Sequence, residues 1–574
     1  MIYDGIITRS VINELNSVLI GGKVEKLSMP SKNEIYIHIY NNQKYILNIN
    51  LNANEARINL TSKVKTLPLS PSMFCMVIRK HLQNYRINSI KQYLFDRIIF
   101  IEFEGYNEMN DKETKYLIIE LMGKHSNCIL VNNNMKIIDS LKHVDDSVSS
   151  VRTVLPGLEY DYPKTKVSIE NTSLDEFDKL IQNYIEKEDN ISRFLISTFN
   201  GFSNFFCFEL LKICNISKDV QIKDLSKDNI KIIYNEINNI IQKIDSNKID
   251  IKNEDNKNMY LDFTVSYTND FSINKYIDEY YISFEQNKQI NELKQNLTRN
   301  VSTYISKLNK NLKIVNKNLK ECEKLEDYRI YGELINSNLY RFSNNERYEN
   351  ISVENYYNNN NLITIPIDNT CSLSLNAQKY FKKYNKLKTT YTYSISQKEL
   401  IENELNYLES VLFNTEASNN IDELSIIKQE LINQKYIKIQ KKKETSKNNI
   451  KSEPIKYTYE GYDIYVGKNN IQNDYLTHKF ANNNDMWLHT QGIHGSHVII
   501  KNSNNNNIPD KIIEFASNLS AYYSKGQTSS KVMVDYCLIK YVKKHPFNKP
   551  GMVIYTDYKS IYTTPDKHEE YIIK

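Results

Sequence analysis

The 574-residue sequence lacks three features that would each assign it to a class of protein. It contains no run of about 18 apolar residues, so no membrane-spanning helix is expected. Its seven cysteines form no Cys-x-x-Cys pair and no cluster with histidine at zinc spacing, which excludes a disulfide scaffold and a zinc-finger protein. The first ten residues carry Asp4 and no apolar stretch, so no secretory signal is expected. A reducing, cytoplasmic location with the thiols as core residues is therefore expected.

A strong charge of either sign is also missing. Lys and Arg number 74 against 69 Asp and Glu, a net charge of +5, so a basic surface for nucleic acid has to be local. Apolar residues make up 40% of the chain, which is enough for packed cores and excludes wholesale disorder. At about 150 residues per domain, the length predicts roughly three to four domains. Composition alone indicates no function.

Glycine and proline are nearly absent from the middle of the chain. Residues 164–453 hold only Gly201, Gly332 and Pro366, whereas the segments before and after each hold six Gly and five Pro. Because both residues interrupt regular elements and populate turns, this pattern predicts two turn-rich ends around a long-helical middle.

Short segments of β-branched and aromatic residues, bounded by turn residues, predict strands near the N-terminus. The expected strands are 34–40, 98–103, 116–122 and 127–131. The segment 71–82 instead places apolar residues at positions 74, 77, 78 and 82, which is the spacing of an amphipathic helix. The first domain is therefore expected to mix α and β structure.

From about residue 281, apolar residues follow one another at steps of three or four. One stripe covers 290–319 without Gly or Pro, and a second covers 401–412. Such a heptad-like pattern is typical of coiled-coil helices. With a strand-and-turn excursion at 351–367 between them, the stripes predict an antiparallel hairpin, and about fifty residues would span roughly 75 Å. Two ordinary amphipathic helices packed in a bundle are the alternative.

A lysine-rich segment follows the second stripe. Residues 435–451 carry seven Lys and one Glu, including the run Lys441, Lys442 and Lys443. Such a segment is usually a solvated linker, and contact with a phosphate backbone is the alternative.

Three blocks of residues together resemble one family. The first block is 74–82 (FCMVIRKHL) with 95–98 (FDRI), the second is 120–127 (ELMGKHSN) with 155–157 (LPG), and the third is 466–470 (VGKNN), 485–489 (DMWLH), 495–498 (GSHV) and 534–536 (VDY). These blocks are similar to those of the NFACT family, ribosome quality-control factors of which some members are also described as fibronectin-binding proteins. The segments 199–203 (FNGFS), 331–335 (YGELI) and 376–380 (NAQKY) match the middle region, so the resemblance covers nearly the whole chain.

The resemblance implies an α+β multidomain fold. Its parts are a mixed α/β NFACT-N domain over 1–172, a helical helix-hairpin-helix-like domain over 176–283, a long antiparallel coiled-coil arm with a small tip insertion over 284–436, a basic linker over 437–453 and an α/β NFACT-R domain over 454–574. Because the second domain holds only Gly201, the glycine-containing hairpin with which such domains grip phosphates is expected to be absent. The chain ends without the extra C-terminal domain of eukaryotic members, so the bacterial type is expected.

The resemblance also implies a tRNA-binding site in the first domain. Asp96 and Arg97 match an Asp-Arg pair with which family members contact tRNA; Arg can fork onto phosphate or guanine, and Asp can accept from a base amine. Neighbouring strand residues face opposite sides, so a shared ligand requires a bulge or turn, and a surface salt bridge is the alternative. Lys124 and His125 are expected in the same site, although a backbone turn alone would explain their loop. Glu120 is expected there too, or else as a buried, paired carboxylate.

Other candidate RNA contacts are more dispersed. They are Arg79, Lys80, Asp485, Trp487, His489 and the run Lys441, Lys442 and Lys443. Neighbouring helix residues cannot all face one way, so Arg79 and Lys80 offer only a partial basic face. Trp487, the only tryptophan, could instead be a core residue with its indole N–H bonded. The nearby histidines lack the spacing and acidic partners of a metal site, so neither a metal nor another cofactor is expected.

No catalytic residue is expected. The NFACT-N domain resembles the N-terminal domain of formamidopyrimidine-type DNA glycosylases, which use an N-terminal proline amine and a four-cysteine zinc finger. Positions 2 and 3 are Ile and Tyr here and no such finger exists, so glycosylase chemistry is unsupported. No nucleotide-phosphate loop is present either. The chain is therefore expected to be a binding factor rather than an enzyme.

The function implied by the resemblance is tRNA recruitment in ribosome quality control. The protein would bind large ribosomal subunits obstructed by peptidyl-tRNA, through rRNA and a stalk-base protein, and bring alanyl-tRNA to them. The ribosome would then add a C-terminal alanine tail that marks the stalled chain for degradation. A small RNA-binding co-factor of tailing is a further candidate partner, and no membrane is expected. The alternative function is a fibronectin-binding surface adhesin, for which no export signal or wall anchor is seen.

Overall fold

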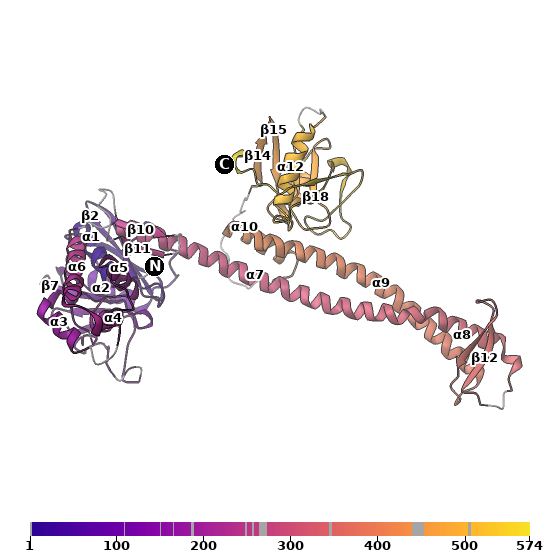
Figure 1. Ribbon diagram of the computed structural model, residues 1–574, viewed down its shortest axis with the longest axis horizontal. Helices are drawn as coiled ribbons and strands as arrows, with labels where there is room; N and C mark the ends of the chain where they lie inside the picture. The colour runs from indigo at the N-terminus through magenta and orange to yellow at the C-terminus, as the bar shows by residue number, and fades with distance from the viewer. Residues whose placement is uncertain are drawn as a thin grey trace. The chain divides into compact units, whose positions relative to one another are not determined.

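The computed structural model describes residues 3–107, 109–147, 149, 151–164, 166–184, 189–246, 250–254, 258–262, 272–343, 347–438, 453–502 and 507–573. The chain divides into two compact units, Met1–Glu285 and Gln286–Lys574. Figure 1 shows the elements of each unit, with a sheet and its helices in the first and a pair of long helices and a second sheet in the other.

The first unit contains a nine-stranded antiparallel sheet in the order β4-β3-β2-β1-β5-β6-β7-β8-β9. Its strands are β1 (Lys23–Ser31), β2 (Glu34–Asn41), β3 (Gln43–Asn50), β4 (Arg57–Leu60), β5 (Arg86–Gln92), β6 (Ile98–Tyr106), β7 (Lys112–Glu120), β8 (Asn127–Asn132) and β9 (Ile137–Ser140). Helices α1 (Gly5–Leu19) and α2 (Met73–Leu82) belong to its core cluster. The Asp4 side chain caps α1 by accepting from the N–H of Ile7, and Val11 and Leu15 of this helix are fully buried.

Four helices after the sheet share its hydrophobic core. They are α3 (Leu174–Gln182), α4 (Ile191–Thr198), α5 (Asn204–Ile213) and α6 (Lys227–Asp245). Each is preceded by a Ser or Asn whose side chain accepts a backbone N–H of the first turn. Their apolar residues join those of the sheet in one cluster, so these helices are part of the first unit's core. The hairpin of β10 (Asp250–Glu254) and β11 (Asn258–Asp262) follows α6.

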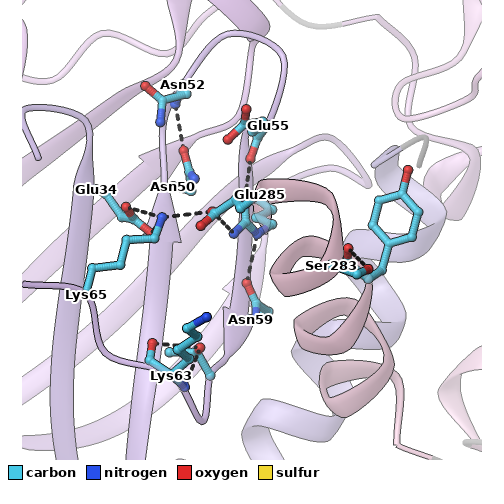
Figure 2. Close-up of polar contacts among 12 residues, drawn as sticks. Glu34, Asn50, Asn52, Glu55, Asn59, Lys63, Lys65, Ser283 and Glu285 are labelled. Carbon is cyan, nitrogen blue, oxygen red and sulfur yellow. Dashed lines mark hydrogen bonds and ion pairs between the residues drawn. The ribbon is translucent and has the colours of Figure 1, made fainter. Parts of the chain in front are cut away.

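Charged side chains fix the start of the long helix α7 (Ile273–Glu321) to the first sheet. Figure 2 shows Lys65 between Glu34 and Glu285, with its Nζ 2.9 Å from the Glu34 carboxylate and 2.8 Å from that of Glu285. Arg57, which is 3% exposed, lies 3.5 Å from Glu285 and stacks over the Tyr281 ring at 3.7 Å. Removing one partner would leave a poorly solvated charge, so the network holds the first turns of α7 against β4.

The second unit begins with an antiparallel helical arm. Its elements after α7 are α8 (Leu325–Ser337), β12 (Asn350–Asn355), β13 (Asn361–Pro366), α9 (Leu373–Ala417) and α10 (Ile421–Asn433). Near the base, Leu297 of α7 is buried with Leu408 of α9 and residues of α10. Farther along, Cys322 lies 3.5 Å from the carbonyl of Leu387, so α9 runs back along α7 (Figure 1). The tip, made by α8 and the β12–β13 hairpin, has a small core of its own.

The second unit also contains a seven-stranded antiparallel sheet in the order β21-β18-β16-β17-β15-β14-β22. Its strands are β14 (Ile455–Tyr459), β15 (Tyr462–Val466), β16 (Met486–Thr490), β17 (Val498–Ile500), β18 (Val532–Leu538), β21 (Lys559–Thr563) and β22 (Ile572–Ile573). The remaining elements are α11 (Asn470–Tyr475), α12 (Asp510–Tyr522), β19 (Val542–Lys544) and β20 (Val553–Tyr555). Neighbouring residues of β16 point to opposite faces of the sheet. Leu488 packs in the cluster that contains α12, and Trp487 packs in the cluster on the other face.

The elements predicted from clear periodicity are confirmed. The expected strands correspond to β2, β6, β7 and β8, the expected helix to α2, the two stripes to α7 and α9, and the excursion between them to β12 and β13. The α+β multidomain class is confirmed as well. The prediction of a helical domain over 176–283 missed β10 and β11, because no Gly or Pro marks that hairpin. Within the described residues, the structure contains no helix with the length and apolar character that a bilayer crossing requires.

Candidate RNA-binding sites

The turn between β5 and β6 has a backbone conformation that its residues rarely adopt. The N–H of Asp96 donates to the carbonyl of Tyr93 at 2.8 Å, and the central residues Leu94 and Phe95 have φ of +46° and +62°. Positive φ at both central positions is typical of the type I′ hairpin turn, which Asn and Gly favour. Two bulky apolar residues are costly there unless the surrounding structure holds them.

Two glycines hold this turn through close backbone contact. The N–H of Gly5 donates to the carbonyl of Gly201 at 2.9 Å, and the Phe95 carbonyl lies against both residues. A Cβ would lie 2.5 Å from that oxygen at Gly5 and 2.1 Å from it at Gly201, where φ is also +72°. Gln92 Nε2 adds hydrogen bonds to the carbonyls of Gly5 at 2.9 Å and Asp96 at 2.8 Å. Both glycine positions therefore require a residue without a side chain.

The segment 199–203 completes this hold on the turn. Asn200 Nδ2 donates to the carbonyl of Leu94 at 3.2 Å. Ser203 Oγ donates to Asp4 at 2.6 Å, which links the segment to the cap of α1. In the sequence analysis this segment was only a match to the family's middle region, with no structural role predicted for it. We call Gly5, Gln92, Asn200 and Gly201 the turn clamp.

Asp96 and Arg97 lie in the clamped turn, before β6 begins at Ile98. Neighbouring residues within a strand face opposite sides, so both side chains can reach one ligand only from a bulge or a turn, and these two residues lie in a turn. The Asp96 carboxylate accepts from the backbone N–H of Arg97 at 2.7 Å. Both residues are half-buried, and no described carboxylate lies within the 4.0 Å that would make a salt bridge with Arg97. The salt-bridge alternative therefore has no partner among the described residues.

The loop after β7 lies next to this turn. The N–H of Leu121 donates to the carbonyl of Arg97 at 2.9 Å. Lys124 and His125 follow in a single 3₁₀ turn, Gly123–His125, and both are exposed. The topology thus brings these two residues and the Asp96–Arg97 pair to the same end of the sheet.

Glu120 is buried and fully engaged by side chains that the sequence did not indicate. Arg152 donates to its carboxylate at 2.6 and 3.2 Å, and the Tyr160 hydroxyl donates at 2.7 Å. This arrangement favours the buried, paired interpretation of Glu120 over base recognition. Its partners are 32 and 40 residues away in sequence, so no local pattern could have revealed the pairing.

An aromatic pair begins at the first residue of the turn. The rings of Tyr93 and Tyr162 stack at 4.7 Å with an interplanar angle of 29°, and Tyr162 is 40% exposed. Exposed aromatic rings offer stacking platforms for unpaired RNA bases. The sequence analysis did not single out either tyrosine. We call Tyr93, Asp96, Arg97, Lys124, His125 and Tyr162 the turn surface.

The remaining basic candidates make fewer contacts that could serve RNA binding, or lie where the structure gives no description. Arg79 is half-buried and its Nε donates to the carbonyl of Leu27 at 2.7 Å, whereas Lys80 is exposed. Lys441, Lys442 and Lys443 lie outside the described residues.

In the C-terminal domain, Asp485 and Trp487 are core residues. The Asp485 carboxylate is 1% exposed and accepts from Lys501 Nζ at 2.5 Å and from the Asn502 N–H at 2.8 Å. Trp487 is fully buried, as the core interpretation expected, but its indole N–H has no hydrogen-bond partner among the described residues. His489 faces a cavity. No three His, Cys, Asp or Glu side chains in the described part of the chain could together hold a metal ion.

Two family models match consecutive parts of this chain. The model of the NFACT N-terminal and middle domains matches residues 4–450, and that of the NFACT protein RNA binding domain matches 455–556. The chain belongs to the NFACT family. The turn surface and clamp of this NFACT protein lie within the first match, and His489 lies within the second.

Two NFACT relatives are similar along their whole length. The Rqc2 homolog RqcH of Bacillus subtilis is 32% identical over 581 residues, covering 99% of this chain and 98% of that protein. The Rqc2 homolog RqcH of Streptococcus pneumoniae is 31% identical over 568 residues with the same coverage. A solved structure, the C-terminal part of the fibronectin/fibrinogen-binding protein from Streptococcus suis, covers 50% of this chain and 99% of its own, at 29% identity and a TM-score of 0.40.

Proposed function

We propose that this NFACT protein acts in ribosome quality control by bringing tRNA to large ribosomal subunits. Its similarity to RqcH proteins over 99% of the chain and its NFACT RNA binding domain support association with RNA and the ribosome. The subunits are those obstructed by peptidyl-tRNA, and the recruited tRNA is alanyl-tRNA. The protein positions the tRNA, and the ribosome makes the peptide bonds of a C-terminal alanine tail that marks the stalled chain for degradation.

The clamped turn at Asp96 and Arg97 is the observation that carries this proposal. A strained backbone persists only where its surroundings over-determine it, and such strain clusters at functional sites. Here the clamp fixes the backbone of a turn that carries both the Asp96 carboxylate and the permanently charged side chain of Arg97, and the Tyr162 ring is exposed nearby. Arg can bind phosphate or a guanine edge, the carboxylate can accept from a base amine, and the ring can stack on a base.

The Asp96→Ala/Arg97→Ala double variant tests the proposal. It should lose copurifying tRNA and alanine tailing, because both polar groups of the turn are gone while the clamp remains. Sequencing of the copurified RNA measures the loss of tRNA, and mass spectrometry of stalled chains measures the loss of alanine tails, while sedimentation with large subunits should stay normal. Lys91→Ala is the matched control, because it removes an exposed charge from β5 of the same hairpin and should leave tRNA recovery unchanged. Normal tRNA recovery with the double variant would contradict the assignment.

Further partners belong to the same proposal. They are rRNA and a stalk-base protein on the subunit, and a small RNA-binding co-factor of tailing. A cytoplasmic location is part of it too. Cell fractionation checks the location and separates this function from that of a fibronectin-binding surface adhesin, which would have to be found outside the cell.

A further inference from the structure

A cavity of about 450 Å³ in the second unit lies between the C-terminal domain and α9. His489 and the loop after it line one side, and Asn406 and Glu409 of α9 line the other. His494 Nε2 lies 3.3 Å from the Glu409 carboxylate, so the two sides meet across the cavity. Binding sites for small ligands typically enclose about 300–1,000 Å³, so the cavity has room for one nucleotide-sized group.

Flat aromatic rings build the wall behind His489. Its imidazole is nearly parallel to the Trp487 ring, with centroids 5.8 Å apart and an angle of 14°. His497 meets both rings edge-on at 5.3 and 5.4 Å, and Tyr555 lies 4.8 Å from Trp487. His489, His497 and Tyr555 all line the cavity. A wall of rings favours a flat aromatic ligand, because such ligands gain stacking and edge contacts from it.

The cavity is polar but carries no positive charge of its own at neutral pH. Burial lowers the pKa of His489 to about 4 and that of His497 well below its usual range, so both imidazoles are neutral. Burial also lowers the pKa of His494, the third histidine of the lining. Among the described residues, no Lys or Arg lines the cavity. A phosphate would find no counter-charge, whereas neutral imidazoles each offer one donor and one acceptor to the edge of a neutral heterocycle.

Glu409 and Asn406 supply groups that can distinguish one base from another. A carboxylate accepts from the exocyclic amine of cytosine or adenine, and an amide pairs with both a donor and an acceptor. We propose that this cavity binds a single unpaired RNA base, stacked against the rings beside His489 and read at its edge by Glu409. The inference rests on the RNA association proposed above and gives it a second contact point, separate from the turn surface.

Trp487 is a built-in reporter for this site. It is the only tryptophan in the chain, and it lies directly behind His489. Full-length protein is titrated with AMP, GMP, CMP and UMP while Trp487 emission is followed, with calorimetry as a second readout. A saturable change with at least one nucleotide is expected, with about a 10-fold preference over the weakest. A single-stranded tetranucleotide of the preferred base should bind more tightly than the mononucleotide, and the reverse order would overturn the assignment to RNA in favour of a free nucleotide.

Two matched variants test the role of α9. Glu409→Gln exchanges an acceptor-only carboxylate for an amide and should change the base preference by about 10-fold. Glu402→Gln is the control. Glu402 is an exposed residue of α9 that pairs with Lys398 and does not line the cavity. Absence of any saturable change with all four nucleotides, or equal preferences for Glu409→Gln and the unaltered protein, overturns the inference. If only this inference fails, the unaltered protein still copurifies with tRNA, and the Arg97 variant does not. If the proposed function itself fails, the unaltered protein does not copurify with tRNA either.

Discussion

At the scale of the residue, Leu94 and Phe95 present an energetic problem that their neighbours solve. Each non-glycine residue in a left-handed conformation costs about 1–2 kcal/mol. Phe95 is fully buried, and burying such a ring contributes about 1.5–3 kcal/mol. The bonds from Gln92 and Asn200 and the contact with Gly201 then fix the direction of the turn. The backbone position of Asp96 and Arg97 is thus set by residues outside the turn surface.

Gly201→Ala should therefore weaken tRNA binding although Asp96 and Arg97 are unchanged. The added Cβ would lie 2.1 Å from the Phe95 carbonyl, so the turn or the segment 199–203 has to move. We expect tRNA affinity to fall by about 10-fold or more, since small displacements of a positioned group are expensive. Binding measurements with the purified variant give the loss of tRNA affinity, and thermal unfolding gives any loss of stability.

Gly21→Ala separates backbone strain from displacement of the turn. Gly21 has a similar φ of +79°, but no atom lies within 4 Å of the position that its Cβ would take. It should lose about 1 kcal/mol of stability and keep normal tRNA binding. Equal tRNA binding by the two variants would show that the clamp does not position the site.

At the scale of the element, Glu430 joins three helices at the base of the arm. It lies on α10, is 2% exposed, and accepts from the Tyr407 hydroxyl of α9 at 2.7 Å and from Asn470 of α11 at 3.3 Å. Burial raises its pKa to about 7, even though both hydrogen bonds act in the opposite direction. Burial therefore favours the neutral form of the Glu430 carboxyl.

Glu430→Gln should stabilise the second unit at pH 8 more than at pH 5. Between the ordinary pKa of 4.5 and about 7, the folded state keeps a proton that the unfolded state releases, so stability falls as pH rises through this window. Gln carries no charge and retains an oxygen acceptor, which removes a cost on the order of 3 kcal/mol above pH 7. Thermal unfolding followed by Trp487 emission measures the difference. The control is Glu416→Gln, which alters an exposed residue of α9 and should change stability by less than about 0.5 kcal/mol.

The features that could be predicted depend on residues close together in the sequence, whereas the missed ones depend on contacts between distant segments. Strands β2 and β6 and helices α7 and α9 follow from local periodicity, which needs no knowledge of the fold. The turn at Leu94 and Phe95 lacks the Asn-Gly signature of its type, because tertiary contacts replace the local preference. The pairing of Glu120 with Arg152 and the burial of Trp487 beside His489 likewise depend on segments brought together only by folding. Asp96 and Arg97 were predicted from family motifs rather than from periodicity, and their role stays a prediction.

At the scale of the whole molecule, one helix serves both units. Helix α7 has 49 residues and is about 74 Å long; it begins in the first unit, where Glu285 is paired with Lys65, and ends in the arm of the second. The net charge of +5 is spread over 574 residues, so long-range attraction to RNA is weak and local contacts have to supply the affinity. The tip of the arm, with its own core and exposed tyrosines such as Tyr340 and Tyr356, is a candidate for one such contact.

Removing the tip tests whether the arm docks on the large subunit. Because Cys322 and Leu387 are in contact, deleting residues 324–385 and joining the ends through a short Gly-Asn loop cuts the arm where its helices already meet. The deletion removes the tip core entirely and leaves the base cluster around Leu297 and Leu408 intact. We expect at least a 10-fold loss of subunit affinity, which corresponds to about 1.4 kcal/mol, with normal copurification of tRNA. Sedimentation of the shortened protein with large subunits at the level of the full chain would show that the docking contact lies elsewhere.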